Sequence, residues 1–397
     1  MAQLILKKYV MKIGIEGQRL YRKKKHGMDM VALELIKNLQ KIDLTNQYVI
    51  FVKPDEDNTC IPYAENFKIV ELTSKFGYPG WEQFSLPKAA YQEGCDVLHC
   101  TSNTGPIFSK VPLITTLHDI IYLESISIFK KEGTWYQKLG NMYRRWFVPS
   151  VIKKSKKVIT VSNYEKDRIN KYFGFQDNRL RAIYNGVGDH FKKVTNEKVL
   201  ESIKESYKLP DNFFFFLGNT DPKKNTKGVL EAYGNFDQLY PNKYQLVMLD
   251  YDENELQKLL QAIGRPELRT NIHLLGYVLN TELPAIISQC TIFLYPSLRE
   301  SFGIPILEGM ACGVPVITSN TSSMPEVAGK DAALIVDPFN SDEITVAMQT
   351  LVKDRLLSKV LAEKGIQRAQ KFSWVSMSQN VLELYKEVYQ EINKPVL

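Results

Sequence analysis

No stretch of the 397-residue chain is apolar over the roughly 18–20 residues that a membrane-spanning helix needs. The opening residues, MAQLILKKYV, contain no apolar segment as long as the core of a signal peptide, so we expect no export. The five cysteines form no CxxC pair and show no Cys/His spacing typical of a metal site. We therefore expect a cytoplasmic protein with buried free thiols, and neither a membrane protein nor a disulfide-linked secreted one.

Internal repeats, low-complexity linkers and a strongly one-sided charge are also missing. Hydrophobic residues make up 44% of the chain and charged residues 24%, and the net charge is +7. This composition is that of an ordinary globular protein, and the length predicts two or three domains. Because no zinc-finger spacing or aromatic-basic RNA-binding motif is present, nucleic acid is not an expected partner. Residues 1–10 precede the first predicted strand and are interpreted as an N-terminal extension.

Short apolar segments alternate with helical or irregular stretches along the chain. Those typical of buried strands are Lys12–Glu16, Tyr48–Val52, Phe67–Glu71, Val97–Cys100, Leu113–Leu117, Phe213–Leu217, Gln245–Leu249, Ile272–Leu275 and Cys290–Tyr295. Such alternation predicts an α/β protein with parallel sheets covered by helices on both faces. Between about residues 188 and 211 the chain is charged and lacks core positions, so we place a domain boundary there.

The segment Tyr295–Gly313, YPSLRESFGIPILEGMACG, predicts a ligand site. It leaves a buried strand, passes through a loop and continues as a helix, in which Pro305 suits the first position and Gly313 the end. The free amides of Phe302–Ile304 and the dipole of this helix would attract an anion, most simply a phosphate.

Two carboxylates flank this predicted phosphate site. Glu300 lies on the loop and Glu308 in the helix that follows. Carboxylates do not bind phosphate, but they accept hydrogen bonds well from sugar hydroxyls. A phosphate-binding loop between two hydroxyl acceptors is what a sugar nucleotide requires.

A second polar group follows the strand that begins FFFFLG. Lys223 and Lys224 lie between this strand and a predicted helix, where they would hold a diphosphate or else form a polar loop that caps the helix. Asp250 and Asp252 form an Asp-x-Asp pair, but acidic residues are favoured at the start of the helix that follows them. We therefore expect no metal site.

Polar residues also follow strands in the first half of the chain. His99 and His118 lie at the ends of two predicted strands, where a histidine is more often buried in the core than part of a site. The loop Gln18–Gly27 joins the first strand to the first helix and carries Arg22, three lysines and a histidine. Loops in this position face the ligand crevice of an α/β sheet, although a run of lysines is usually solvated.

The string ESFGIPILEGMACGVPVI resembles the signature of the large retaining glycosyltransferase family called group 1 or family 4. The matching positions are Glu300, Phe302, Gly303, Pro305, Glu308, Gly309, Gly313 and Pro315. The TLHD sequence around His118 and the lysine at 224 are similar to further sites of this family. The resemblance covers nearly all of residues 11–390 and implies the GT-B fold, in which two Rossmann-like domains face an interdomain cleft.

Domain roles and site residues follow from this resemblance. It implies an N-terminal, acceptor-side domain of residues 11–188 plus 376–397, and a C-terminal, donor-binding domain of residues 189–375. The implied reaction moves a hexosyl group from a nucleoside diphosphate sugar to an acceptor hydroxyl, with retention and without a metal cofactor. The residues implied as catalytic are His118, Glu300 and Lys224. Those implied as donor-binding are Gly27, Lys223, Tyr277, Phe302, Gly303, Ile304 and Glu308.

Two other functions are compatible with the same fold. A sugar-nucleotide epimerase would need no acceptor, and a non-catalytic protein would bind the sugar nucleotide without cleaving it. The presence of both Glu300 and Glu308 favours the transferase. By family analogy, its acceptor is a glycan or a lipid-linked glycan in cell-surface polysaccharide or glycolipid assembly.

The region 130–157 has an excess of lysine and arginine over acidic residues. The large apolar residues Trp135, Leu139, Met142, Tyr143 and Trp146 recur there at helical spacing. A basic amphipathic helix with tryptophans favours peripheral contact with an anionic membrane, such as the inner face of the cell membrane. The alternative is that the aromatic face of this helix belongs to the core, and the sequence leaves both open.

Overall fold

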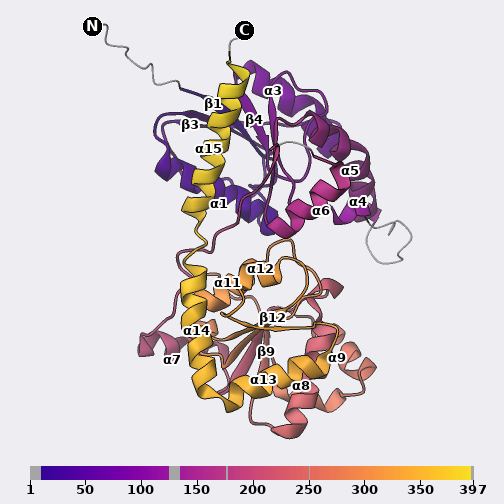
Figure 1. Ribbon diagram of the computed structural model, residues 1–397, viewed down its shortest axis with the longest axis vertical. Coiled ribbons are helices and arrows are strands. Elements are labelled where there is room, and N and C mark those ends of the chain that lie inside the picture. Colours follow the sequence, from indigo (N-terminus) through magenta and orange to yellow (C-terminus); the bar gives the residue numbers. More distant parts are fainter. Residues whose placement is uncertain (1–9, 125–134, 176–177, 250, 395–397) are drawn as a thin grey trace. The chain divides into compact units, whose positions relative to one another are not determined.

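The computed structural model describes residues 10–124, 135–175, 178–249 and 251–394. The chain divides into two compact units (Figure 1). The first runs as far as Tyr184 and resumes at Trp374, and the second comprises Asn185–Ser373. The boundaries expected from the sequence, after residues 188 and 375, fall close to these. The predicted extension, residues 1–10, lies outside the described residues except for its last position.

The first unit contains a seven-stranded sheet with the strand order β3-β2-β1-β4-β5-β6-β7. All of its neighbouring strands pair in parallel. Its strands are β1 (Lys12–Gly17), β2 (Gln47–Val52), β3 (Phe67–Glu71), β4 (Val97–Cys100), β5 (Leu113–Thr116), β6 (Lys157–Thr160) and β7 (Leu180–Ala182). Its helices are α1 (Gly27–Ile42), α2 (Gly77–Gly80), the π-helical turn η1 (Trp81–Ser85), α3 (Leu86–Gln92), α4 (Ile121–Glu124), α5 (Trp135–Lys154), α6 (Asn163–Phe173) and α15 (Trp374–Ile392).

The alternation of side chains along β4 and β5 shows which helices cover each face of this sheet. Cys100 packs in the cluster that includes η1 and α3, and its register partner Thr115 contacts Ser155, just after α5, through hydroxyls 2.8 Å apart. His99 points to the opposite face, where its Nδ1 lies 2.7 Å from the Tyr385 hydroxyl of α15. Helices α3 and α5 therefore cover one face, and α15, which packs against α1, covers the other.

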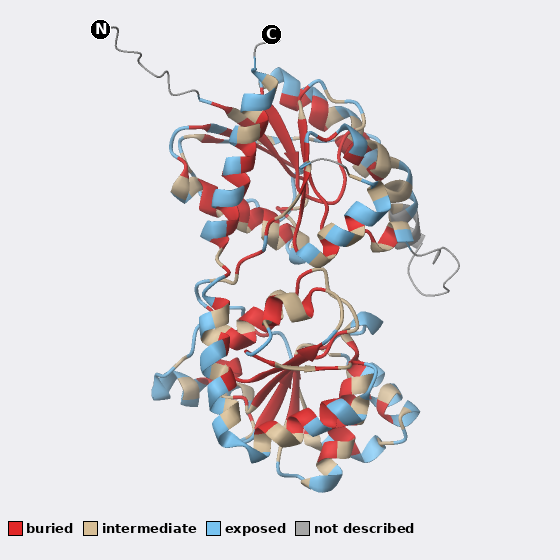
Figure 2. Cartoon of the chain, viewed as in Figure 1, coloured by how far each residue is buried: buried red, intermediate tan, exposed pale blue. Residues whose placement is uncertain are grey.

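The second unit has a six-stranded parallel sheet with the order β10-β9-β8-β11-β12-β13. Its strands are β8 (Phe213–Phe216), β9 (Gln245–Leu249), β10 (Ile272–Leu275), β11 (Ile292–Tyr295), β12 (Val316–Ser319) and β13 (Leu334–Val336). Its helices are α7 (Glu197–Tyr207), the 3-10 turn η3 (Pro222–Lys224), α8 (Thr226–Leu239), α9 (Glu253–Ala262), the 3-10 helix η4 (Pro266–Asn271), α10 (Leu283–Ile287), α11 (Ile304–Ala311), α12 (Met324–Ala328), α13 (Ser341–Lys353) and α14 (Arg355–Ala369). Figure 2 shows that the central strands of both sheets are buried.

Every strand named from the sequence is present, which confirms the prediction of parallel α/β sheets. In each sheet the strand order reverses beside the first strand of that unit, between β1 and β4 and between β8 and β11. Loops that leave the carboxyl ends of such a pair run in opposite directions and open a crevice, where ligands of this fold class bind. The sequence motifs singled out above follow these strands.

The helix of the Tyr295–Gly313 segment begins one residue earlier than predicted. Ile304 is its first residue, so Pro305 occupies the second position, where its missing N–H still costs no helical hydrogen bond. The helix ends at Ala311, and Gly313 follows with φ 71°, the left-handed conformation typical of a residue after a helix. Among the described residues, no helix is both long and apolar enough to cross a membrane.

Gly309 allows α11 to pack directly on β11, because a Cβ added there would lie 2.8 Å from Phe293 Cγ. We predict that Gly309→Ala lowers the free energy of unfolding by about 1–3 kcal/mol, the usual cost of overpacking a core. The measurement is the urea unfolding transition. Gly140→Ala in α5 is the control, because no atom lies within 4 Å of an added Cβ there. Equal transitions for the two variants would contradict this packing argument.

Candidate active site

The candidate site of the second unit lies where its strand order reverses. The loop after β8 contains η3 with Lys224, and the loop after β11 contains Glu300. A backbone hydrogen bond joins the two loops directly, since Leu298 N donates to the Lys223 carbonyl at 2.7 Å. Lys224 and Glu300, which the sequence suggested as phosphate and sugar ligands, are therefore brought together here.

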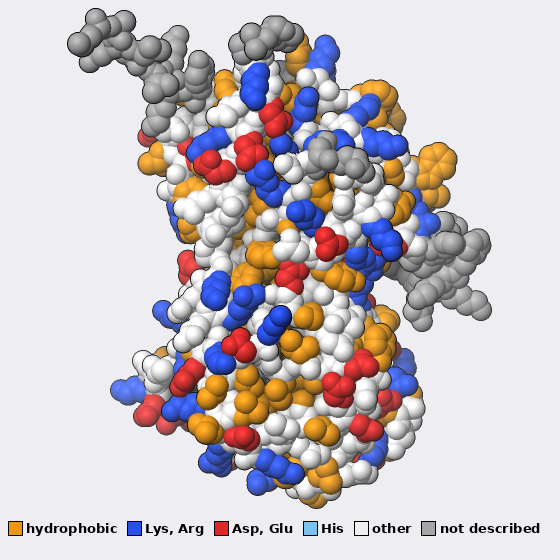
Figure 3. Space-filling model, in the orientation of Figure 1, with side chains coloured by type: hydrophobic (Ala, Val, Ile, Leu, Met, Phe, Trp, Pro, Cys, Tyr) orange, Lys and Arg blue, Asp and Glu red, His pale blue; other side chains and the backbone are white. Residues whose placement is uncertain are grey.

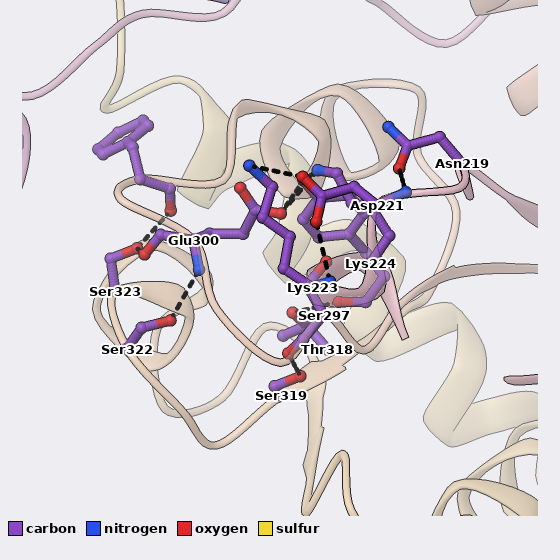
Figure 4. A network of polar contacts seen from close by, with 12 residues as sticks. Asn219, Asp221, Lys223, Lys224, Ser297, Glu300, Thr318, Ser319, Ser322 and Ser323 are labelled. Carbon is purple, nitrogen blue, oxygen red and sulfur yellow. Dashed lines mark hydrogen bonds and ion pairs between the residues drawn. The ribbon is translucent and has the colours of Figure 1, made fainter. Parts of the chain in front are cut away.

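Lys224 and Glu300 form a largely buried ion pair at the centre of this site (Figure 4). Lys224 Nζ donates to Glu300 Oε1 at 2.6 Å and to the Tyr295 hydroxyl at 2.7 Å, and the exposed fractions of the two charged side chains are 16% and 13%. The Tyr295 hydroxyl in turn donates to Glu300 Oε1 at 2.9 Å. Burial and the neighbouring Glu300 charge raise the pKa of Tyr295 well above its ordinary value, so this hydroxyl keeps its proton.

Hydroxyl side chains at the end of β12 and in the segment after it hold the Glu300 loop in place (Figure 4). Ser323 Oγ donates to the carbonyls of Glu300 and Phe302, at 2.9 and 2.8 Å, and Ser322 Oγ accepts from Glu300 N at 3.0 Å. Thr318, Ser319 and Thr321 donate to the carbonyls of Tyr295, Ser297 and Leu298. A loop with this many satisfied carbonyls has a fixed backbone, which positions the Glu300 carboxylate before a ligand arrives.

Asn225 joins a third loop to the same site. Its side-chain amide donates to the carbonyls of Pro296 and Pro338, at 3.0 and 2.7 Å, so the loops after β8, β11 and β13 are held together. Asn225 adopts φ 60°, a conformation that asparagine tolerates better than most residues. Asn225, Tyr295 and the hydroxyl run were not predicted as site residues from the sequence; the dense TSNTSS string at the end of a strand is the signal that was present.

The amino end of α11 lies beside Glu300. Gly303 is its N-cap and adopts φ 102°, which strongly favours glycine, and an added Cβ would lie 3.1 Å from Ile306. Because glycine has no side chain to cap the helix, the first amides, including that of Ile304, are not satisfied by the N-cap residue. The Phe302 side chain is buried against Phe372, with ring centroids 5.9 Å apart, so only its backbone can serve a ligand.

Glu308 lies in α11, one helical turn after its start. Burial raises the pKa of its carboxyl to about 7, while the positive charge of Lys224 opposes this rise. The carboxylate and its protonated form are therefore both accessible near neutral pH, unlike those of an ordinary glutamate.

Lys223 and Tyr277 lie outside the central cluster. Lys223 Nζ is 3.3 Å from Asp221 Oδ2, and its side chain is 45% exposed. Tyr277 follows β10, which is separated from β8 by β9, and 79% of its surface is exposed. Of the described polar contacts, none joins either side chain to Glu300 or Lys224.

The remaining predicted residues belong to the first unit. His118 follows β5 and is buried, its backbone N–H donates to Asn103 Oδ1 at 2.5 Å, and its Nε2 donates to the Thr101 carbonyl at 3.0 Å. Burial lowers the pKa of His118, so the ring is neutral and its Nδ1 is the nitrogen without a proton. Gly27 is exposed at the start of α1 and has no atom within 4 Å of an added Cβ, so the chain itself does not require glycine there.

His99 is a core residue. Its Nδ1 lies 2.7 Å from the Tyr385 hydroxyl and its Nε2 2.7 Å from Thr116 Oγ1, so both nitrogens are engaged. Burial, reinforced by the neighbouring His118, lowers its pKa to about 3, which keeps the ring neutral. This histidine joins α15 to the sheet of the first unit.

A group of buried carboxylates at the β1/β4 reversal was not anticipated from the sequence. Glu16 Oε2 accepts hydrogen bonds from the backbone and hydroxyl of Thr101, at 3.2 and 3.0 Å. Glu82 accepts from the hydroxyls of Tyr78 and Tyr143, both at 2.6 Å, and burial raises its pKa. The first unit therefore also has polar groups at its strand reversal, rich in hydrogen-bond acceptors.

Of the Asp-x-Asp pair, Asp252 caps α9 by accepting from Glu255 N at 2.9 Å, while Asp250 lies outside the described residues. Among the residues that are described, no group of three or more His, Cys, Asp or Glu side chains is arranged to hold a metal ion.

Comparison with known proteins places the chain in a family. Residues 200–368 match the family model described as glycosyl transferases group 1, and residues 26–190 match that described as Glycosyltransferase Family 4. The chain is 28% identical over 273 residues to the O-antigen chain mannosyltransferase B of Escherichia coli. This match covers 69% of this chain and 70% of that protein. It is 26% identical to the serotype-specific mannosyltransferase WbdA of Escherichia coli over 59% of this chain, and that match spans only 29% of WbdA.

Solved structures share the fold. Anabaena HepE in complex with UDP and glucose superimposes with a TM-score of 0.70 and 18% identity, over 95% of this chain and all of that one. WaaG, a glycosyltransferase involved in lipopolysaccharide biosynthesis, gives a TM-score of 0.70 at 15% identity, over 94% of this chain and 99% of that one. With two parallel Rossmann-like sheets, matched family models across most of its length and these GT-B neighbours, the chain belongs to the group 1/family 4 glycosyltransferases.

Proposed function

We propose that this glycosyltransferase transfers a hexosyl group, with retention of the anomeric configuration, from a nucleoside diphosphate sugar to an acceptor hydroxyl. The observation that carries the proposal is the Lys224–Tyr295–Glu300 cluster, with the amino end of α11, which its N-cap side chain does not cap, in the same loop region. This cluster offers a cation and backbone amides to a diphosphate, and a fixed carboxylate to sugar hydroxyls. The HepE structure, which binds UDP and glucose, supports this class of donor.

In this mechanism Lys224 binds the diphosphate of the donor and Glu300 binds its sugar. Both side-chain hydrogen bonds that Glu300 accepts among the described residues go to Oε1, and we assign Oε2 as the acceptor for sugar hydroxyls. Lys224, held by Tyr295 and Glu300, places its charge where the leaving diphosphate gains negative charge, with Lys223 as a second, more exposed cation. Stabilising charge as it develops is the usual way to lower such a barrier.

The amides of Gly303 and Ile304 and the Glu308 carboxylate complete the donor site. We assign the amides to a phosphate and Glu308 to the ribose hydroxyls, with Tyr277 near the base. Because burial has already shifted the pKa of Glu308 to about 7, hydrogen bonds from ribose would favour its ionised form and release a proton.

We assign the first unit to the acceptor. Its carboxylates Glu16 and Glu82 suit sugar hydroxyls, Gly27 allows close approach of a ligand to the first loop, and neutral His118 contacts the transferred sugar. We propose that the leaving phosphate itself takes the acceptor proton, and that the two lysines serve in place of a metal ion. This mechanism depends on positioning and needs no covalent enzyme intermediate.

The names of the relatives suggest the sugar and the setting. Because two of them are O-antigen or serotype-specific mannosyltransferases, we propose mannose as the transferred sugar and a cell-surface polysaccharide or glycolipid as the product. We further propose that the enzyme works in the cytoplasm. All five cysteines are free thiols, which suits a reducing compartment.

The first test is a thermal-shift panel with UDP, GDP, dTDP and ADP, each with and without EDTA. A ligand at about 100 times its dissociation constant should stabilise the fold by roughly 2.7 kcal/mol. We expect one nucleotide to raise the melting temperature most, with no effect of EDTA. If none binds, the donor site is wrongly assigned; if binding is lost with EDTA, the metal-free mechanism is wrong.

We predict that Glu300→Gln lowers kcat for nucleotide release from the donor roughly 100-fold, since the loss of one transition-state hydrogen-bonding charge typically costs this much. The affinity for the nucleoside diphosphate should change by less than about threefold, because we assign the nucleotide to the lysines, the amides of α11 and Glu308. Glu363→Gln, an exposed change on α14, is the matched control. A near-normal kcat for Glu300→Gln would remove Glu300 from the mechanism.

If Glu308 binds the ribose, affinity for the nucleotide depends on pH. Ribose hydroxyls bind the carboxylate form, so affinity falls as pH drops through about 7. The dissociation constant should be about tenfold larger at pH 6 than at pH 8. Because phosphate groups titrate in the same range, the quantity to compare is the pH dependence of wild type minus that of Glu308→Gln, measured by calorimetry. Identical pH profiles would refute the ribose assignment.

The rival functions give different products from the same donor. An epimerase would return an intact nucleotide with an altered hexose, and a binding protein would leave the donor unchanged. NMR of the sugar after incubation with the protein therefore distinguishes both from a transferase, which releases the nucleoside diphosphate.

A further inference from the structure

One positive charge of the first unit is buried with few partners. Arg19 lies in the turn after β1, where Leu20 N donates to the Gly17 carbonyl at 3.0 Å. Its side chain is 13% exposed, and its Nε lies 3.0 Å from Asp29 Oδ1, without the alignment of a hydrogen bond. Nη2 is buried and has no hydrogen-bond partner among the described residues. Because a guanidinium has five N–H donors, most of the donor capacity of Arg19 is unused.

The acidic residues of this region do not satisfy Arg19, because their oxygens accept hydrogen bonds from other groups. Asp29 Oδ2 accepts from His26 N at 3.0 Å, so only its other oxygen faces Arg19. Both oxygens of Glu16 accept from backbone N–H groups, at 2.9 and 3.2 Å. Glu82 accepts from four side chains. The positive charge of Arg19 is therefore only partly compensated within the part of the chain that the structure describes.

Arg19 lies near the residues that we assign to the acceptor. Burial and the charges of Glu82 and Glu16 raise the pKa of Tyr78, and the Arg19 charge opposes this rise. Burial lowers the pKa of His118, and the Arg19 charge adds to this effect. A charge that acts on both side chains lies at the β1/β4 strand reversal, where ligands of this fold class bind.

A second polar group of the same turn is also unsatisfied. Gln18 is 7% exposed, and its Oε1 is buried without a hydrogen-bond partner among the described residues. Buried polar groups are nearly always hydrogen-bonded in proteins, so two such groups in one turn point to a ligand that supplies the partners. The helix that follows, α1, begins at Gly27, which is exposed and has no atom within 4 Å of an added Cβ. Its start is therefore open to a ligand.

The loop from this turn to α1 adds positive charge. Residues 17–28 contain five Lys or Arg and no Asp or Glu. Two of the five, Lys23 and Lys25, pair with acidic residues of the segment 55–57. On the face that Figure 3 shows, basic and acidic side chains are interspersed over the surface. Selection of an anion therefore depends on a local site such as this loop, rather than on the charge of the whole surface.

We propose that the acceptor is a sugar with an acidic group, either a phosphate ester or a carboxylate, and that Arg19 binds this group. The inference rests on the proposed function, in which the first unit binds the acceptor. A phosphate or carboxylate offers two oxygens to the planar guanidinium and neutralises its charge. A neutral hydroxyl would leave that charge uncompensated. Gln18 Oε1 would accept a hydrogen bond from a hydroxyl of the same sugar.

The test is calorimetric titration of the full chain with mannose, mannose 6-phosphate and glucuronate at constant ionic strength, with a saturating amount of the nucleotide selected by the thermal-shift panel. Wild type should bind mannose 6-phosphate, glucuronate or both at least about tenfold more tightly than mannose, because a hydrogen bond to a charged group contributes about tenfold or more in affinity. Binding of the phosphate sugar alone would identify a phosphate ester, and binding of glucuronate alone a carboxylate. Equal binding of all three sugars would overturn the proposal.

Arg19→Gln should weaken binding of the preferred acidic sugar at least about tenfold and leave that of mannose unchanged. Arg19→Lys, which keeps a positive charge beside Asp29, should weaken it at least about threefold, because an ammonium group cannot form two parallel hydrogen bonds with an oxyanion. Thermal unfolding shows whether each variant is folded; if Arg19→Gln is not, Arg19→Lys decides the question. Wild-type affinity in either folded variant would refute the assignment.

Lys24→Gln is the matched control, since it removes one positive charge from an exposed position of the same loop. It should bind acidic sugars like wild type. An equal loss in Lys24→Gln and Arg19→Gln would show a general effect of loop charge and would count against a site at Arg19.

The donor assignment is tested separately. Arg19→Gln should bind nucleotide like wild type in the thermal-shift panel, and a loss of nucleotide affinity would assign Arg19 to the donor and overturn this inference. If no nucleotide binds to wild type, the titrations are made without one; a preference for acidic sugars that depends on Arg19 would then stand while the proposed donor site fails. Nucleotide binding without such a preference would count against the Arg19 site alone.

Discussion

The ion pair between Lys224 and Glu300 is the contact on which the geometry of the second unit's site depends. An ion pair removed from water contributes little net stability, because desolvation of both charges offsets their attraction. Its value here is positional: it links the loop after β8 to the loop after β11 across the strand reversal. Tyr295 shares both partners, so a single cluster fixes a cation, a carboxylate and the end of the central strand.

Further hydrogen bonds in the surrounding loops support this ion pair. Hydroxyls of the segment 318–323 satisfy the backbone of the Glu300 loop, and Asn225 holds three loops together. Such hydrogen bonds place the ligating groups before a substrate binds, so binding energy is not spent on ordering them. The first unit repeats the arrangement at its own reversal with a different chemistry, where Glu16, Glu82 and neutral His118 supply hydrogen-bonding groups.

Helix α5 shows how one element can serve two environments. Its residue Tyr143 is bound to the buried Glu82, while Trp146 of the same helix remains exposed. The aromatic content of the region therefore does not show by itself which side chains are buried, because aromatic residues of this helix lie both in the core and at the surface. The side chains of Trp135 and Leu139 lie outside the described residues.

The sequence by itself determined the parallel α/β class, the strand positions and the role of the Tyr295–Gly313 segment as a strand, loop and helix, because each depends on local periodicity and on Pro and Gly. It also indicated Lys224 and Glu300, through their positions after strands. Only the tertiary structure decided that the two meet, that Tyr295 contacts both, that Asn225 holds the surrounding loops together and that His99 is core. These facts depend on strand order and on contacts between residues far apart in the chain, which no local pattern contains.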